Sequence, residues 1–176
     1  IGGEANQWSP ALYEDMTKIE PPHDPKYHLM TDLANQAITW TNSQKSLTPN
    51  KPFFTYFAPG ATHAPHHVPK EWIAKYKGKF DQGWDQLREE IFARQKKLGW
   101  VPPSTELTPR DPTMPAWADI PEAERAFQTR LMELYAGFCE HTDAQVGRLI
   151  EYLDQTAQRD NTLIFYIWGD NGSSAE

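Results

Sequence analysis

TLIFYIWGDNG, residues 162–172, is the stretch that decides the fold class. Residues 162–168 form a continuous apolar run, which is typical of a central strand covered on both faces. The Gly-Asp-Asn-Gly segment that follows would stand at the carboxyl end of this strand, where ligands bind in open α/β sheets. The stretch therefore predicts a buried strand that leads directly into a site.

Working outward, apolar spacing predicts three helices and a second strand. A long helix begins near Pro121 and carries a helical stripe of apolar residues as far as Leu153. Shorter helices are expected over 31–40 and 81–98, the second ended by Gly99. The aromatic run 52–58 reads as a buried strand. Strand, helix and strand in this order predict an α/β fold with a mixed, mainly parallel sheet flanked by helices, present here in part.

Composition narrows the classes of function. The 176 residues include 17 basic and 24 acidic side chains, a net charge of −7, which argues against a nucleic-acid binder. We find no apolar stretch of the roughly 18 residues that a membrane span needs. The single cysteine, Cys139, excludes a disulfide within the chain and a cysteine zinc cluster, and the compartment stays open.

Asp170 and Asn171 offer hard oxygen atoms of the kind that Ca²⁺ or Mg²⁺ prefers. Asp-Asn-Gly is also a favoured turn sequence, and on the pattern alone the turn is the stronger interpretation.

Three histidines lie in the loop that follows the predicted strand 52–58. His63, His66 and His67 stand within five positions, between Gly60 and Pro69. Histidine is suited to proton transfer near neutral pH and to binding oxyanions, so a functional role and a plain surface loop are equally weighted. Zinc binding is poorly supported, because the spacing is not helical and no cysteine assists.

The segment Glu140-His141-Thr142-Asp143 in the long helix is interpreted as a solvated face. Cys139 beside it is interpreted as a core residue, since no base at useful spacing marks it as a nucleophile.

Together these segments resemble the formylglycine-dependent type I sulfatases (arylsulfatases) of the alkaline-phosphatase-like superfamily. The resemblance is carried by KPFFTYFAPGATHAPHHVPKEW, residues 51–72, by YAGFCEHTDAQVGRLIEYL, residues 135–153, and by DNTLIFYIWGDNG, residues 160–172. It extends to the start of the chain, and the insert 70–121, helical and proline-rich, resembles the larger bacterial arylsulfatase branch.

The resemblance implies that the chain, residues 1–176, is an internal piece of one sulfatase catalytic domain. It implies that Asp170 and Asn171 help to bind Ca²⁺, ahead of Mg²⁺ or Mn²⁺, and that His66 contacts the sulfate and the ester oxygen. His63 is the second choice for that role. The family nucleophile is a formylglycine made in a Cys/Ser-x-Pro-x-Arg motif, and Cys139 does not stand in one. We therefore expect the piece alone to be inactive, with the nucleophile in a preceding segment.

The implied reaction is hydrolysis of a sulfate ester to an alcohol or phenol plus sulfate. The expected substrate is a small sulfate ester or a sulfated glycan, with no nucleic-acid partner. Two alternatives stay open: a phosphoester or phosphonate hydrolase of the same superfamily, and a noncatalytic sulfatase-like domain. In the second case the insert, with Trp72, Trp84, Trp100 and Trp117, would serve as an oligomer contact or a lid if its tryptophans faced solvent.

Overall fold

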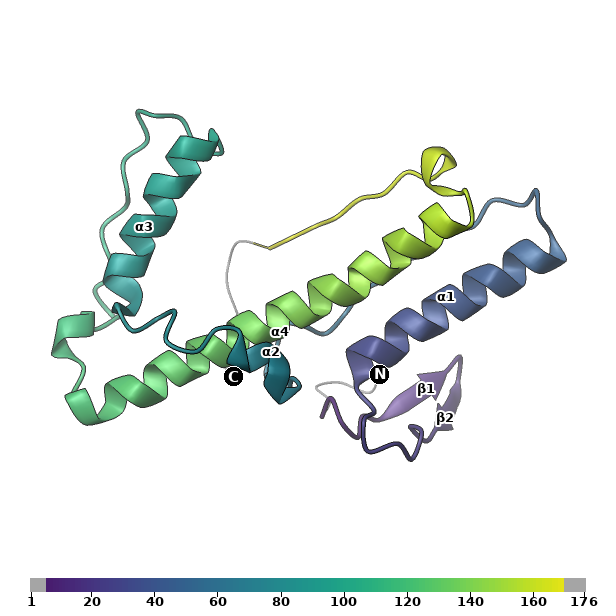
Figure 1. The fold of residues 1–176 in the computed structure, drawn as a ribbon, viewed down its shortest axis with the longest axis horizontal. Helices are drawn as coiled ribbons and strands as arrows, with labels where there is room; N and C mark the ends of the chain where they lie inside the picture. Colours follow the sequence, from purple (N-terminus) through teal and green to yellow (C-terminus); the bar gives the residue numbers. More distant parts are fainter. Residues whose placement is uncertain (1–5, 170–176) are drawn as a thin grey trace.

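A computed structural model describes residues 6–169 and is built around one long helix. This helix, α4 (Glu122–Gln155), runs through the middle of the molecule with α1 (Leu29–Leu47) beside it (Figure 1). The other elements are β1 (Leu12–Glu14), β2 (Thr17–Ile19), α2 (Lys70–Ala74), α3 (Gly83–Leu98) and the 3-10 turns η1 (Trp117–Asp119) and η2 (Arg159–Asn161).

The three helices predicted from apolar spacing are confirmed. The expected helix 31–40 is the middle of α1, which begins at Leu29 because the His28 side chain accepts a hydrogen bond from the Met30 amide. Gly99 ends α3 in the left-handed conformation, with φ 75°, and its amide donates to the carbonyls of Gln95 and Lys96. Pro121 precedes the first turn of α4, as expected.

α1 and α4 lie side by side and run in the same direction. Hydrogen bonds join Thr31 to His141, Asn35 to Arg148, and Asn42 to Tyr152, so positions along both helices increase together. The core lies near the start of α1, where Phe138, Leu29 and Met30 are fully buried. Full burial of one such side chain contributes about 1.5–3 kcal/mol.

α2 crosses α4 at a glycine. A Cβ atom added to Gly137 would lie 3.1 Å from the backbone nitrogen and Cα of Ile73 and from the carbonyl carbon of Trp72. The two backbones therefore approach as closely as a glycine allows. This contact fixes where the chain re-enters the core after the histidine loop, since Val68 and Ile73 are both buried next to it.

The two predicted buried strands are corrected by the structure. Residues 52–58 and 162–168 form no strand, and their side chains are largely exposed: Phe54 is 84% and Ile167 is 88% accessible. Residues 162–169 run back along α4 as an extended trace (Figure 1). A strand needs a neighbour to accept its backbone hydrogen bonds, and within residues 6–169 neither segment has one.

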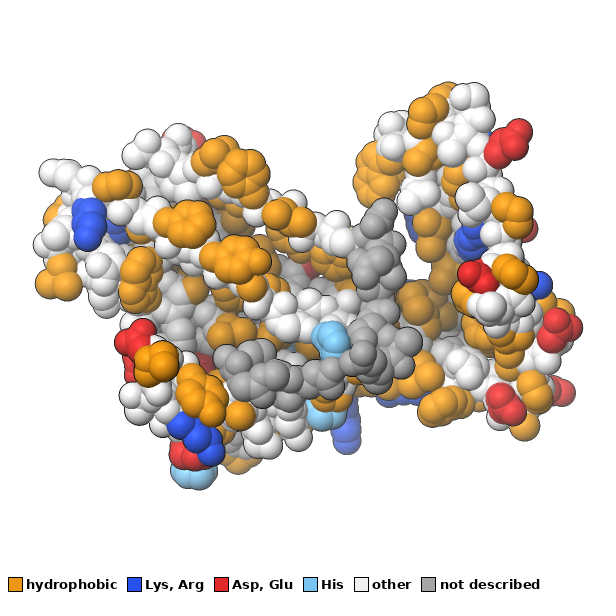
Figure 2. All heavy atoms as spheres, turned by 180° about the vertical axis from the view of Figure 1, so that it is seen from behind, with side chains coloured by type: hydrophobic (Ala, Val, Ile, Leu, Met, Phe, Trp, Pro, Cys, Tyr) orange, Lys and Arg blue, Asp and Glu red, His pale blue; other side chains and the backbone are white. Residues whose placement is uncertain are grey.

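A mainly parallel sheet is likewise not seen among the described residues. The sheet formed there is the antiparallel pair β1–β2, in which Leu12 lies opposite Ile19. The expectation of parallel pairing rested on the two apolar runs, and both lack a partner in this part of the chain. Figure 2, the reverse face, shows many hydrophobic side chains on the surface of the half that holds these segments.

The insert 70–121 contains α2, α3 and η1, and α3 projects away from the α1–α4 pair (Figure 1). Trp72 packs on the core, and Trp84 packs against Trp117, whereas Trp100 is 73% exposed. Of the four tryptophans, Trp100 is the one that is largely exposed, which weakens the interpretation of the insert as a tryptophan-rich contact surface. Within residues 6–169, none of the helices combines the length and apolar character required to cross a bilayer.

We predict that Gly137→Val destabilises the protein by about 1–3 kcal/mol, because the new side chain meets the α2 backbone. Gly147 in the same helix is the matched control: no atom lies within 4 Å of a Cβ placed there. Gly147→Ala should stabilise by about 0.5–1 kcal/mol through the lower entropy of the unfolded chain. Urea denaturation measures both changes, and equal tolerance of the two substitutions would contradict the close α2–α4 contact.

Candidate active site

The histidine loop, residues 60–69, is held by hydrogen bonds within itself. The His66 Nε2–H donates to the Thr62 carbonyl at 3.1 Å, and the His63 Nδ1–H donates to the Ala64 carbonyl at 2.8 Å. The backbone amides of His63 and His67 add bonds to the carbonyls of Gly60 and Pro65. All three histidine side chains are half-buried, so the loop presents oriented imidazoles rather than mobile surface groups.

A fourth histidine, His28, fastens this loop to the core. Its Nε2–H donates to the His67 carbonyl at 3.0 Å, and its Nδ1 accepts from the Met30 amide at 3.2 Å. One side chain thus caps α1 and holds the backbone of the histidine loop, which requires the neutral Nε2–H tautomer. Burial lowers the His28 pKa and favours that state. Sequence reasoning missed His28, because no local motif surrounds it.

His141 lies against His28 in the same buried group. The two ring centroids are 4.4 Å apart, and Trp72 closes the group at 5.3 Å from the His141 ring. Burial, reinforced by His28, lowers the pKa of His141 to about 4, so both imidazoles are neutral at pH 7. The predicted solvated face is therefore wrong for His141 and Thr142, which are buried, while Asp143 is exposed as expected.

A cavity of about 220 Å³ joins the histidine loop to the end of the predicted C-terminal strand. Its lining residues are Ala61, Thr62, Tyr135, Cys139, Thr142, Ile167, Trp168 and Gly169. The loop and the segment before Asp170 are far apart in sequence, and the fold brings them to one place. Asp170 and Asn171, the expected metal ligands, lie outside the described residues.

Two side chains of α4, Cys139 and Thr142, border this cavity. The Thr142 hydroxyl is buried and makes no hydrogen bond within residues 6–169. The Cys139 thiol is half-buried, and burial raises its pKa, which makes it a poor nucleophile. Cys139 therefore lies at the wall of the cavity and outside the buried core cluster in which it was expected, and Thr142 contributes a buried hydroxyl to the same wall.

Tyr135 stands between this cavity and a larger apolar one on the insert side of α4. Its ring lies 5.6 Å from the His66 ring, edge to face, and burial raises the pKa of its hydroxyl. His66 borders the larger cavity. The structure therefore places His66 beside an apolar chamber and next to Tyr135, a residue that the sequence pattern had marked only as part of a helical stripe.

Glu140 belongs to the support of α2 rather than to the candidate site. It accepts a hydrogen bond from Lys75 at 2.8 Å, and this bond lowers its pKa. Lys75 also lies 3.6 Å from the Trp72 ring centroid. Among residues 6–169 no cluster of three or more His, Cys, Asp or Glu side chains has the arrangement of a metal site.

The chain is similar to known proteins along its length. The family model described as Sulfatase matches residues 2–176. An uncharacterized sulfatase of Schizosaccharomyces pombe is 35% identical over 130 residues, which is 73% of this chain and 23% of that protein. An arylsulfatase of Klebsiella aerogenes is 30% identical over 160 residues, 91% of this chain and 33% of that protein. The chain thus spans between about a quarter and a third of the length of these relatives.

The neutral histidine pair predicts a loss of stability in mild acid. His141 takes up a proton at its usual pKa of 6.5 when unfolded, but only near pH 4 when folded. The unfolded state therefore binds more protons between these values, and stability falls as the pH is lowered from 6.5 towards 4, by about 3 kcal/mol for the full shift. His141→Gln should flatten this dependence.

Denaturation at pH 7 and at pH 4.5 measures the difference, with His23→Gln as the control because His23 is exposed and outside the group. The control should keep the dependence of the unaltered chain. An identical pH dependence in all three proteins would exclude a role for buried neutral His141.

Proposed function

The chain belongs to the sulfatase family, and from this we propose that it is part of the catalytic domain of a sulfuric ester hydrolase of the arylsulfatase type. The reaction would convert a sulfate ester to an alcohol or phenol plus sulfate. Family membership also assigns the chain to an alkaline-phosphatase-like α/β fold. The described residues contribute mainly the helical part of that fold.

One observation carries the proposal: the cavity of about 220 Å³ that the histidine loop shares with Trp168 and Gly169. Asp170 and Asn171 follow Gly169 directly in the sequence. A proton donor and a pair of oxygen ligands are the two contributions that this part of a sulfatase would make to one site. Thr62, whose carbonyl accepts the hydrogen bond from His66, lines this cavity together with Gly169. The histidine loop and the segment just before the expected ligands thus border one cavity, which supports a catalytic role over a noncatalytic one.

We assign to His66 the protonation or hydrogen bonding of the leaving ester oxygen, and His63 is the second candidate. The bond from Nε2–H to the Thr62 carbonyl and the contact with the Tyr135 ring orient the His66 imidazole, so the proton passed to the ester oxygen would come from Nδ1 of the imidazolium form. His28 holds the loop in position by donating a hydrogen bond to the His67 carbonyl. Such a general acid contributes roughly 10²–10⁴-fold in rate.

The donor chemistry of Asp170 and Asn171, one carboxylate and one amide, fits a hard cation such as Ca²⁺. When bound, the metal would supply positive charge to the sulfate oxygens. The family's formylglycine would supply the nucleophile, and no Cys/Ser-x-Pro-x-Arg motif for it is found in the 176 residues. What this chain contributes is the proton donor, its positioning, and a share of the metal ligands.

We predict that His66→Ala lowers kcat by about 10²–10⁴-fold in the full-length protein that contains this chain. The loss should grow from 4-nitrophenyl sulfate to phenyl sulfate, because the less acidic phenol depends more on protonation. His23→Ala, at an exposed position, is the control and should leave kcat unchanged.

The same series separates the two candidates. A normal rate for His66→Ala with a strong loss for His63→Ala would move the role to His63. Normal rates for both, or the same loss on both substrates, would exclude a general acid in this loop. Comparison with phenyl phosphate tests the alternative phosphoester activity.

Ca²⁺ binding is predicted to weaken in Asp170→Ala and in Asn171→Ala by on the order of tenfold or more, which corresponds to about 1.4 kcal/mol. Isothermal titration calorimetry of the full-length, chelator-treated protein measures the affinity. Asp160→Ala is the matched control, because Asp160 is an exposed acidic residue ten positions before Asp170. Equal affinities in all variants would remove these residues from the metal site.

A further inference from the structure

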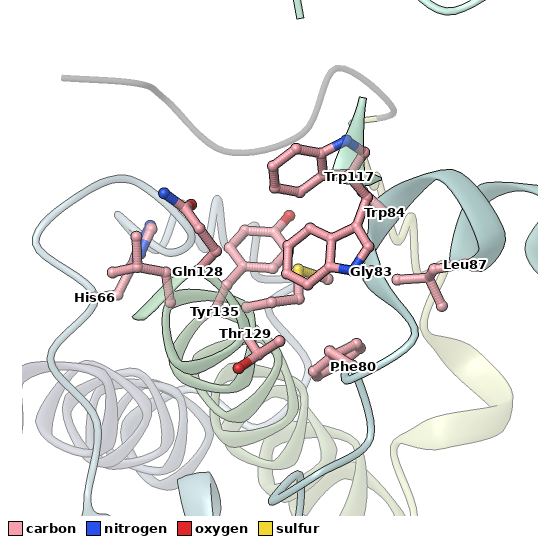
Figure 3. Close-up of a pocket in the computed structure, with 11 residues that line it drawn as sticks. His66, Phe80, Gly83, Trp84, Leu87, Trp117, Gln128, Thr129 and Tyr135 are labelled. Atoms are coloured by element: carbon pink, nitrogen blue, oxygen red, sulfur yellow. The ribbon is translucent and has the colours of Figure 1, made fainter. Parts of the chain in front are cut away.

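The insert and α4 line an open apolar cavity of about 500 Å³ next to the candidate site. Figure 3 shows it in close-up, with the indole rings of Trp84 and Trp117 lying opposite His66 and Gln128. Phe80 and Leu87 extend the insert wall, and Leu131 and Met132 belong to the α4 wall. The volume lies within the range of sites that hold small organic ligands.

Hydrogen bonds and a ring contact within the insert fix the positions of Trp84 and Trp117 without a ligand. The Trp84 Nε1–H donates to the Pro115 carbonyl at 3.1 Å, and the Trp117 amide donates to the Asp85 carboxylate at 2.7 Å. The two indoles meet edge to face with centroids 4.8 Å apart. Gly83 makes this possible, because a Cβ there would lie 2.2 Å from the Trp117 ring.

The insert is also fastened to α4. The buried Glu133 carboxylate accepts from the Gly78 amide at 2.8 Å and from Arg130 at 2.7 Å. Burial opposes the charge of Glu133, but these hydrogen bonds outweigh it and lower its pKa. Arg125 holds the chain around η1 through the carbonyls of Ile120 and Ala118. Both walls therefore keep their positions relative to each other.

The chemistry of the lining selects the kind of group that fits. Of its 11 residues, four carry polar side chains, namely His66, Gln128, Thr129 and Tyr135. A sugar would bring several hydroxyls to a wall of indole and aliphatic carbon, where unpaired polar groups cost free energy. A planar apolar group would instead stack on the tryptophans.

We propose that this cavity binds the apolar, aromatic alcohol part of the sulfate ester, with Trp84 and Trp117 as specificity-determining residues. The inference rests on the proposed function, because it takes His66 as the group that meets the ester oxygen. With the oxygen at His66, the rest of the leaving alcohol lies in the chamber that His66 borders. The substrate class is thereby an aryl or polycyclic sulfate rather than a sulfated glycan.

The test compares 2-naphthyl sulfate with methyl sulfate in the full-length protein. Trp84→Ala and Trp117→Ala should lower kcat/KM for the naphthyl ester by about 10- to 100-fold, mainly through KM. The methyl ester should change by less than about threefold, because it does not reach the cavity. Trp84→Phe should recover part of the loss. Trp100→Ala is the matched control, a tryptophan of the same insert that is exposed and outside the cavity.

A second variant tests whether the loss in Trp84→Ala comes from the cavity itself or from a disrupted insert. Thr129→Trp fills the cavity from α4 without altering the insert, and it should reduce the naphthyl rate as strongly as Trp84→Ala. Equal effects on both esters, or effects no larger than those of Trp100→Ala, would overturn the proposal.

Binding of 2-naphthol by isothermal titration calorimetry separates this inference from the proposed function. The affinity should fall about 10-fold or more in Trp84→Ala and in Thr129→Trp and stay unchanged in Trp100→Ala. Absence of sulfate release by the unaltered protein would refute the proposed function alone. Unchanged 2-naphthol affinity across the variants would refute the aromatic cavity, whatever the activity.

Discussion

The contact between α2 and α4 at Gly137 is the constraint on which the rest of the structure depends. Because no side chain separates the two backbones there, the chain leaving the histidine loop is pressed against the middle of α4. Phe138, the next residue, fills the core below, and Tyr135 and Cys139 face the cavity that the loop shares with residues 167–169. One short stretch of α4 thus meets α2, the core and the candidate site together.

The contacts that His28 and His141 make in the core require both imidazoles to be neutral. His28 can accept from Met30 and donate to His67 at the same time only as the uncharged imidazole. His141, with its pKa near 4, packs against it without repulsion at pH 7. Protonation of His28 would break its hydrogen bond with the Met30 amide, and protonation of both rings would create a buried like-charge pair. The position of the histidine loop therefore depends on the protonation state of these two core histidines.

The helices could be predicted from the sequence, because the spacing of apolar residues and the stop at Gly99 are local signals. The runs 52–58 and 162–168 were misassigned as buried strands, because a strand depends on a partner that its own residues do not reveal. In the candidate site, the His-Ala-Pro-His pattern marked a loop that contributes residues to both cavities, and its catalytic role stays a prediction. His28 and His141 stand 39 and 74 positions from His67, as the numbering in the sequence gives, so only the fold could relate them.

Under the proposed function, the two cavities on either side of Tyr135 would bind the unlike halves of a sulfate ester. The smaller cavity ends at Gly169, directly before Asp170, and on this proposal it would take the anionic head, whereas the larger one would take an apolar alcohol. The net charge of −7 agrees with this division, because repulsion between an acidic surface and a ligand grows with the ligand's charge. A sulfate monoester carries one negative charge, whereas a phosphate monoester carries nearly two and a sulfated glycan carries many. On the proposed function, charge and cavity chemistry, which arise from different residues, would both favour a singly charged ester with a large apolar group.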